Sequence, residues 1–431
     1  MILILILCIL SLVYGLFKYK NLHNPCSIFF LIWGILSFLS SFGFYGANTP
    51  NQNTYIIIFI GLFSFLMGSI LVGYIKINTS LSDSNEEFSI NYKLIIILHF
   101  ITIVFLIYQS ITVITLLRNG FTLKNIRYMS TDTGYNMLRS SNFIVLVQNF
   151  IVTPTVYLSI AVVPIDIFKG NRSKLLFIST LFITVLWVLT TGGRSIILWF
   201  TIYFFYLIRF YGKKIKLKKW MKLLIISLSF ILTIFFIVTT KSRKGSNVDF
   251  LYQAYLYFVV PIIHFEYRLD YISYYYSNTY GYGIASFYGF LYPFIFILQF
   301  FGINVPLFSQ MRELSFTILE NPIFVGNNIT MNAFVTFFYQ FYLDGGMLGV
   351  CIGSFIFGGF SIYAYKKAVL SNKGKWVLIY LLILQKLIFS FVRFYFTQPV
   401  QAVCMIMALF VYKRAKHQSF TTSGILIKKS N

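Results

Sequence analysis

The sequence TTGGRS at residues 190–195 is the sharpest local motif in the chain. Two adjacent glycines, Gly192 and Gly193, suit a tight turn that requires positive φ or a close approach of the backbone. The guanidinium group of Arg194 can bind two phosphate oxygens at the same time. The motif therefore predicts a turn that presents an arginine to a phosphate group. The alternative is a simple turn whose arginine extends to the lipid headgroups.

A second cluster, with the sequence HFEYRLD at residues 264–270, combines a histidine, two carboxylates and an arginine. Histidine and glutamate are common general bases, and arginine is a natural clamp for phosphate. We therefore expect His264 or Glu266 to act as a catalytic base and Arg268 to bind an anionic group. A solvated polar turn is the alternative.

A third group comes from the sequences NITMNAF at residues 328–334 and YQFYLDGGMLG at residues 339–349. We expect Asn332, Gln340 and Asp344 to shape a polar pocket beneath an outer loop. As an alternative role for Asp344, its carboxylate would cap the apolar helix that follows it and favour the dipole of that helix.

Membrane-spanning helices have to position these residues. Of the 431 residues, 58% are hydrophobic and only 11% are charged, whereas soluble domains carry roughly 25% charged residues. Apolar runs of about 20 residues cross a bilayer as helices, because lipid offers the backbone no hydrogen-bond partner. We therefore expect an all-α polytopic integral membrane protein, a single transmembrane domain over residues 1–431 with about 11–13 transmembrane helices.

The expected spans are 1–17, 26–46, 54–75, 94–117, 143–165, 175–191, 195–211, 221–240, 346–365, 376–396 and 398–412. The apolar start MILILILCIL lacks a basic region and a cleavage site, so it is expected to be a retained span rather than a signal peptide. Two further stretches, 250–263 and 284–303, contain prolines and many tyrosines, so they either cross the membrane, re-enter it or lie in its interface.

The net charge of +24 is explained by short cytoplasmic loops, which collect Lys and Arg in membrane proteins, so we expect no nucleic-acid partner. Placing the basic loops inside leaves residues 241–345 as a long extracytoplasmic segment with re-entrant or interfacial helices. If both ambiguous stretches cross instead, the cluster at 264–270 moves to the cytoplasm.

Positive charge on the outer side runs against the usual distribution. Arg243, within the sequence KSRK, and Arg312 lie in the long outer segment, which suggests an anionic partner; contact with lipid headgroups is the alternative. Lys386 and Arg393 are seven residues apart, so they would lie on one face of a helix 376–396. Charges within a span tend to face the bundle interior or a cavity.

No cofactor is expected. The sequence contains no phosphate-binding loop, zinc motif, haem motif or Asp-rich metal cluster, and no dinucleotide-binding domain that would hold a nucleotide sugar. The four cysteines lie in apolar runs or at the start of one and suggest no disulfide. Any chemistry must therefore use a substrate that reaches the protein through or at the membrane.

Taken together, these motifs resemble those of the Wzy-type oligosaccharide repeat-unit polymerases, the O-antigen and capsular polysaccharide polymerase family. The resemblance rests on the order of features: the TTGGRS turn, the long aromatic outer segment with YGYG at 280–283, then NITMNAF and DGGMLG before a span. It covers roughly residues 170–365 by motif. The residues that match the motifs are Gly193, Arg194, Asn332, Asp344, Gly345 and Gly349.

The resemblance implies a membrane glycosyltransferase on the outer face of the bacterial cytoplasmic membrane. It would transfer a glycan chain from undecaprenyl diphosphate to another lipid-linked repeat unit and so build O-antigen or capsule. Its partners would be the undecaprenyl-diphosphate-linked oligosaccharide, membrane lipid, and chain-length regulator and flippase proteins.

For this reaction the departing diphosphate needs cations that stabilise its developing charge. We expect Arg194, Arg243, Arg268 and Arg312 to supply them. Two alternatives remain open from the sequence. A ligase that transfers finished polymer would share the architecture, and a flippase of lipid-linked oligosaccharides would be expected to show internal repeats and polar spans.

Overall fold

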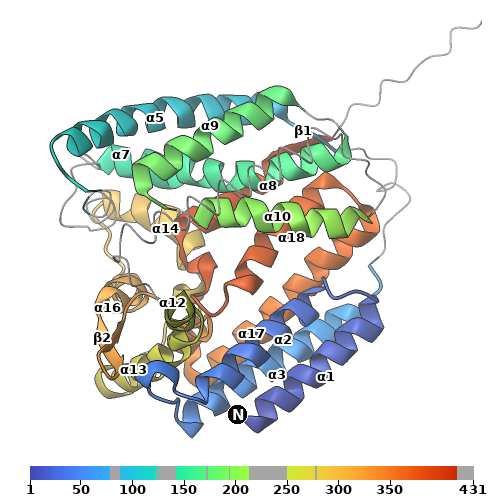
Figure 1. Ribbon diagram of the computed structural model, residues 1–431, viewed down its shortest axis with the longest axis vertical. Coiled ribbons are helices and arrows are strands. Elements are labelled where there is room, and N and C mark those ends of the chain that lie inside the picture. The colour runs from blue at the N-terminus through green and yellow to red at the C-terminus, as the bar shows by residue number, and fades with distance from the viewer. Residues whose placement is uncertain are drawn as a thin grey trace, which may run out of the picture.

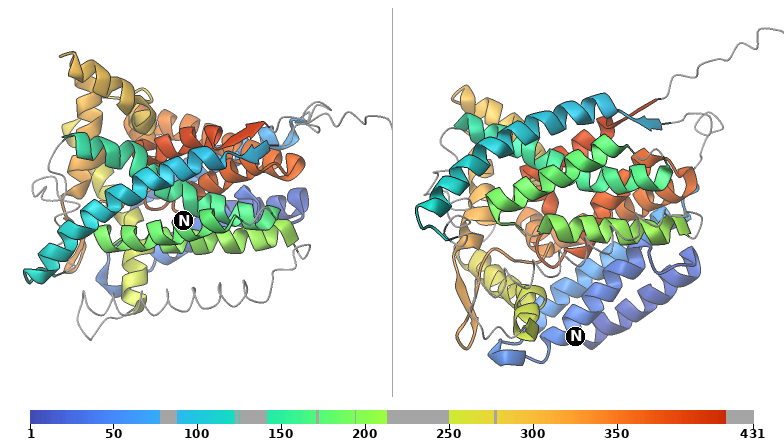
Figure 2. Two further views of the ribbon diagram at one scale, coloured as in Figure 1. Left: turned by 90° about the horizontal axis from the view of Figure 1, so that it is seen from above. Right: turned by 45° about the horizontal axis from the view of Figure 1, so that its top comes forward.

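Helices dominate the computed structural model, which describes residues 1–77, 88–122, 125, 142–170, 173–193, 195–212, 250–276 and 279–414. Figures 1 and 2 show that α5, α8, α9 and α10 run side by side in one part of the bundle, while α1, α2, α3 and α17 form another. Between these two parts lie α18 and α19, which contact both each other and α8.

The α-helices, in chain order, are α1 (Ile2–Tyr19), α2 (Pro25–Ser40), α3 (Gln52–Tyr74), α5 (Tyr92–Arg118), α7 (Asn142–Val147), α8 (Thr153–Lys169), α9 (Lys174–Thr191), α10 (Ser195–Tyr211), α12 (Phe250–Phe258), α13 (Val260–Tyr275), α14 (Ile284–Phe300), α15 (Pro306–Arg312), α16 (Ile318–Glu320), α17 (Phe338–Ser371), α18 (Gly374–Ile388) and α19 (Pro399–Phe410). The 3-10 turns are η1 (Phe44–Gly46) and η5 (Tyr395–Thr397), and the π turns are η2 (Gln148–Val152) and η4 (Glu313–Thr317). Two antiparallel strand pairs complete the fold: β1 (Phe88–Ile90) with β4 (Tyr412–Arg414), and β2 (Ile323–Gly326) with β3 (Ile329–Met331).

Six helical segments among the described residues are long and apolar enough to cross a membrane: Ile2–Tyr19, Gln52–Tyr74, Tyr92–Arg118, Phe143–Lys169, Lys174–Thr191 and Phe338–Ser371. Shorter apolar helices cover Pro25–Ser40, Ser195–Tyr211, Ile284–Phe300 and Pro399–Phe410. The prediction of an all-α membrane protein is confirmed at this level, and the count of about 11–13 spans stays a prediction. The expected span 221–240 lies outside the described residues.

Polar caps fix where several helices begin. Asn24 precedes α2, and its side chain accepts a hydrogen bond from the backbone N–H of Ser27 at 2.9 Å. Asn51 precedes α3 and accepts in the same way from the N–H of Thr54 at 2.8 Å. Such caps satisfy N–H groups that have no partner within the helix.

One expected span and one of the ambiguous stretches do not form single continuous helices. The stretch predicted at 376–396 is helical only over α18, because the chain leaves the helix at Phe389 and turns back toward α19. The ambiguous stretch 250–263 is divided between α12 and α13, with Pro261 in the first turn of α13. Proline is favoured there because its missing N–H would have no intrahelical partner.

Hydrogen bonds between segments far apart in the sequence join several helix ends and loops. At one end, the ammonium group of Lys366 donates to the carbonyl oxygens of Val72, Gly73 and Ile75 at 2.6–3.2 Å, and β1 pairs with β4. Elsewhere, the turn after α2 pairs with β2, since the N–H of Asn48 donates to Val325 O at 2.9 Å.

Helices α3 and α17 pack backbone against backbone (Figure 1). A Cβ atom on Gly68 would lie 2.0 Å from Phe355 O, and one on Gly358 would lie 2.2 Å from Phe65 O. In a membrane, where lipid is as apolar as the side chains, small residues that allow such close packing drive helix association.

We predict that Gly68→Val destabilises the protein by about 1–3 kcal/mol, because the new side chain separates α3 from α17. The measurement is the thermal unfolding midpoint of the purified protein in detergent. Leu71→Val is the matched control, since Leu71 lies one turn away on α3 and is 55% exposed. Equal midpoints for Gly68→Val and wild type would show that this packing is wrong.

Candidate functional site

His264 and Arg268 lie one turn apart on α13 and form a buried pair. The Nε atom of Arg268 donates to Nε2 of His264 at 2.9 Å. Nδ1 of His264 lies 2.6 Å from the carbonyl oxygen of Phe334, and because a carbonyl only accepts, Nδ1 carries the proton. The imidazole is therefore neutral, and its one lone pair is occupied by Arg268.

Arg268 brings a positive charge into the protein, and no carboxylate of the described residues lies beside it. It is only 3% exposed, and its terminal nitrogen donates to Asn321 O at 2.6 Å. Burial lowers the pKa of Arg268, and the titratable groups that act on it are Tyr339 and Tyr271 rather than an acid of the described chain. Because arginine stays protonated in proteins, the site keeps a net positive charge.

Arg393 joins the same region from another part of the chain. The prediction that Lys386 and Arg393 share one helix face is wrong, because α18 ends at Ile388 and Arg393 lies in the segment before η5. Its guanidinium donates to Ala333 O at 2.8 Å. Ala333 precedes Phe334, the residue that His264 contacts, so Arg393 and His264 bind one short piece of chain.

We call residues 319–334 the hairpin loop; it contains β2 and β3. Its ends are tied together, because the N–H of Ala333 donates to Leu319 O at 2.5 Å and the Asn332 amide donates to Glu320 O at 3.2 Å. Ala333 has φ of 62°, a left-handed conformation that is unfavourable for a residue with a Cβ atom. The two arginines and His264 bind the backbone on both arms of this loop, which explains how the conformation is held.

Asp344 caps a different helix from the one expected. Its carboxylate oxygens accept from the N–H groups of Ala285 and Ser286 at 2.8 and 2.9 Å, at the start of α14. The helix α17 already begins at Phe338 and is broken directly after Asp344. The interpretation of Asp344 as a cap for its own following helix is therefore wrong.

The glycines that follow Asp344 make the break in α17 possible. Gly346 has φ of 59° and ψ of −138°, a combination that is essentially restricted to glycine. The chain then folds so closely that a Cβ atom on Gly349 would lie 2.1 Å from Phe341 O. This geometry gives a structural reason for the spacing of the DGGMLG sequence.

Asn332, Gln340 and Asp344 do not share a hydrogen bond in the described structure. Asn332 is exposed and binds Glu320 O, whereas Gln340 is buried and accepts weakly from the N–H of Phe394 at 3.4 Å. Each side chain binds a different backbone segment. The expected polar pocket is not formed by direct contact among the three.

Glu266 faces away from the pair formed by His264 and Arg268. Its Oε2 atom accepts from the N–H of Asn51 at 2.5 Å and from the Thr54 hydroxyl at 3.2 Å, at the start of α3. The side chain is half-buried, and no hydrogen bond occupies Oε1 in the described structure.

The TTGGRS turn is only partly described. Gly192 ends α9 with φ of 60°, as expected for a turn that needs glycine, and the N–H of Gly193 donates to the Thr191 hydroxyl at 3.1 Å. Arg194 and Arg243 lie outside the described residues, so their roles stay predictions. Arg312 is exposed at the end of α15 and acts electrostatically on Tyr288.

Lys386 is buried between α18 and α19. Its ammonium donates to the amide oxygens of Gln401 at 2.7 Å and Gln385 at 3.2 Å, and it lies 5.6 Å from the centre of the Phe396 ring. The amide oxygens replace the hydration that the charge loses on burial. The predicted position of Lys386 in the bundle interior agrees with this geometry.

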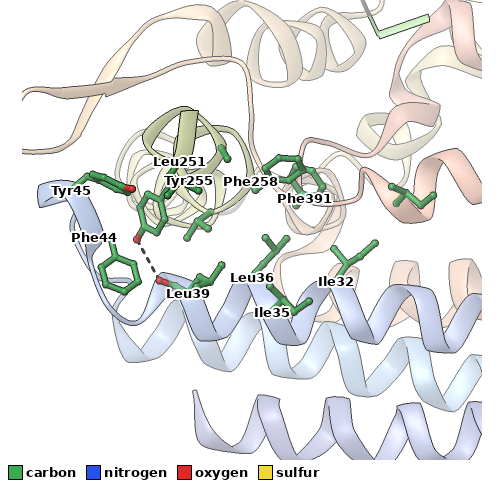
Figure 3. Close-up of a pocket in the computed structure, with 13 residues that line it drawn as sticks. Ile32, Ile35, Leu36, Leu39, Phe44, Tyr45, Leu251, Tyr255, Phe258 and Phe391 are labelled. Atoms are coloured by element: carbon green, nitrogen blue, oxygen red, sulfur yellow. Dashed lines mark hydrogen bonds between the residues drawn. The ribbon is translucent and has the colours of Figure 1, made fainter. Parts of the chain in front are cut away.

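The sequence interpretation missed an apolar pocket of about 780 Å³ between α2 and α12 (Figure 3). One wall is formed by Ile32, Ile35, Leu36 and Leu39, the i, i+3, i+4 and i+7 positions of α2. The opposite wall comes from α12, and Phe391 lines the pocket two residues before Arg393. The stripe on α2 is visible in the sequence, but its partner α12 could not be identified from periodicity alone.

Comparison with protein-family models, with curated proteins and with solved structures finds no match to this chain.

The burial of His264 makes the stability of the protein depend on pH. Burial, together with the charge of Arg268, lowers the pKa of His264 from 6.5 to about 4. The unfolded chain therefore binds a proton at higher pH than the folded protein does, so stability is greatest above the unfolded pKa and falls as the pH drops toward 4.

We predict that acidification from about pH 7 to about pH 4.5 removes up to roughly 3 kcal/mol of stability through His264. The measurement is the unfolding midpoint of wild type and His264→Asn across this range. The asparagine keeps a donor for Phe334 O but does not titrate, so its profile should be flatter. Parallel profiles for the two proteins would contradict the buried neutral histidine.

Proposed function

We propose that the protein polymerises undecaprenyl-diphosphate-linked oligosaccharide repeat units into surface polysaccharide, by glycosyl transfer on the outer face of the bacterial cytoplasmic membrane. The observation that carries the proposal is that Arg268 and Arg393 both bind the backbone of the hairpin loop. Arg393 also follows, by two residues, Phe391 of the apolar pocket. A polyprenyl diphosphate combines a doubly charged headgroup with a long apolar chain, which suits both features.

The pocket supports the lipid part of this substrate. Its lining is aliphatic and aromatic, with Tyr45 and Tyr255 as the sole residues that carry a polar side-chain group. The Tyr255 hydroxyl is already directed at Leu39 O, 3.4 Å away (Figure 3). Burial of isoprenoid carbons there would be driven by the removal of apolar surface from water or from lipid headgroups.

The arginines support the diphosphate part. In the proposed reaction an acceptor hydroxyl oxygen bonds to the anomeric carbon of the donor, the bond from that carbon to the diphosphate breaks, and its electron pair leaves with the diphosphate. Negative charge therefore grows on the leaving oxygen, and guanidinium groups already fixed by backbone contacts need no reorganisation to stabilise it. We expect Arg194 to contribute to the same task from the TTGGRS turn, with Arg243 and Arg312 as further candidates.

The hydroxyl proton needs an acceptor. His264 would have to release Arg268 before its Nε2 atom could take a proton, so its geometry supports a role in positioning Arg268. Glu266 keeps Oε1 without a hydrogen bond in the described structure and is therefore the better candidate for the base.

We predict that Arg393→Gln lowers polymer formation by about 10²-fold or more, because a fixed donor to the leaving group is lost. The measurement is polymer length on gels from cells that carry the variant at a protein level matched to wild type, with lipid-linked units quantified on each side of the membrane. Arg118→Gln is the control, since Arg118 is an exposed arginine at the end of α5.

Single units that accumulate on the outer side of the membrane would support the polymerase. Full-length polymer in the Arg393→Gln cells would show that Arg393 is not part of the site. Accumulation of units on the inner side would indicate a flippase, and finished polymer that is no longer attached to its final acceptor would indicate a ligase.

A further inference from the structure

An exposed group of tyrosines surrounds the C-terminal end of α13 and the turn that leads into α14. Within α13 the rings of Tyr271 and Tyr275 lie 4.7 Å apart, and those of Tyr274 and Tyr275 lie 4.7 Å apart. The ring of Tyr271 also lies 6.1 Å from that of Tyr276. We call these four residues, with Tyr280 and Tyr282, the tyrosine platform.

The platform is accessible. Tyr274 and Tyr275 are 79% and 64% exposed, and Tyr282 is 79% exposed. Tyr280 and Tyr282 contact each other with ring centres 6.4 Å apart. Large aromatic rings that remain this exposed and contact one another mark an interaction site more often than isolated exposed residues do.

The platform adjoins the arginine site. Tyr271 follows Arg268 by three residues on α13, so the two share a helix face, and Tyr271 acts electrostatically on Arg268. A chain attached to a group held at Arg268 would therefore meet Tyr271 first and then the rings of Tyr275 and Tyr274.

The chemistry of the platform differs from that of the apolar pocket. Every ring of the platform carries a hydroxyl, whereas the pocket is lined by Ala, Ile, Leu, Val and Phe apart from its two tyrosines. Two exposed carboxylates border the platform. Asp270, next to Tyr271 in sequence, acts electrostatically on Tyr342, and Tyr280 of the platform acts on the same residue. Glu313 acts electrostatically on Tyr276. Hydroxyls disfavour a hydrocarbon ligand, and carboxylates disfavour a polyanion.

We propose that the tyrosine platform binds the glycan of the donor, the growing chain whose diphosphate is held at the arginines. A sugar ring presents C–H groups on one face, which suit the electron-rich face of an aromatic ring, and hydroxyls at its edge, which suit tyrosine hydroxyls and carboxylates. This inference rests on the proposed function and assigns a site for the part of the substrate that grows.

A platform of this kind retains the growing chain between successive transfers. It contributes little when the donor carries one repeat unit, because few sugars reach beyond Tyr271. It contributes more when the donor carries several units that extend over Tyr275 and Tyr274. The platform therefore favours long polymers.

The test compares wild type with the double variant Tyr274→Ala/Tyr275→Ala, purified and reconstituted in lipid vesicles. For donors with several repeat units we expect KM to rise about tenfold, equivalent to about 1.4 kcal/mol, while kcat and the KM of single-unit donors change by less than about twofold. Polymers should become shorter. Tyr108→Ala is the control, because Tyr108 on α5 is 56% exposed and lies on an element that provides no part of the platform.

A second readout does not require catalysis. Soluble oligosaccharide, prepared by partial hydrolysis of the surface polysaccharide of the source cells, is titrated against the same proteins. About tenfold weaker binding by the double variant supports the platform, even if wild type forms no polymer and the proposed function fails. Equal binding and equal KM for the two proteins overturn it. Lower thermal stability in bilayers with unchanged binding also overturns it and makes the patch a belt of tyrosines at the membrane interface.

Discussion

Backbone that leaves a helix inside an apolar protein must find its hydrogen bonds within that protein, and this constraint organises the region described here. The hairpin loop and the segment after α18 are the two main irregular pieces. Carbonyl oxygens of the hairpin loop are bound by Arg268, His264 and Arg393. These contacts hold the guanidinium groups of Arg268 and Arg393 in fixed positions. No carboxylate of the described residues forms a close pair with Arg268.

Broken helices create the room for this arrangement. The segment after α18 runs antiparallel to the residues just before α17, since Phe337 N–H donates to Ser390 O and Val335 N–H to Val392 O, both at 2.8 Å. Before this segment, Lys386 joins α18 to α19 through Gln401. A helix that continued past Ile388 would remove these contacts and displace Arg393, so the ends of the short helices determine where the positive charge lies.

The sequence predicted the helices well where hydropathy and caps agree. The spans expected at 175–191 and 195–211 match α9 and α10, and the glycine turn between them has the positive φ that was expected. The end of α18 could not be predicted, because the apolar run continues past Ile388 and the break depends on hydrogen bonds to distant chain. The role of Asp344 as a cap for α14 depends in the same way on contact between distant parts of the chain. The hydrogen bond from Arg393 to the hairpin loop could not be predicted for the same reason.

In the proposed reaction a polyprenyl diphosphate leaves while a glycosidic bond forms. The most direct test places purified protein in vesicles with isolated undecaprenyl-diphosphate-linked repeat units and measures undecaprenyl diphosphate and new linkages together. We expect one molecule of undecaprenyl diphosphate to be released for each linkage formed as polymer appears. Movement of intact units between leaflets without release of diphosphate would contradict it.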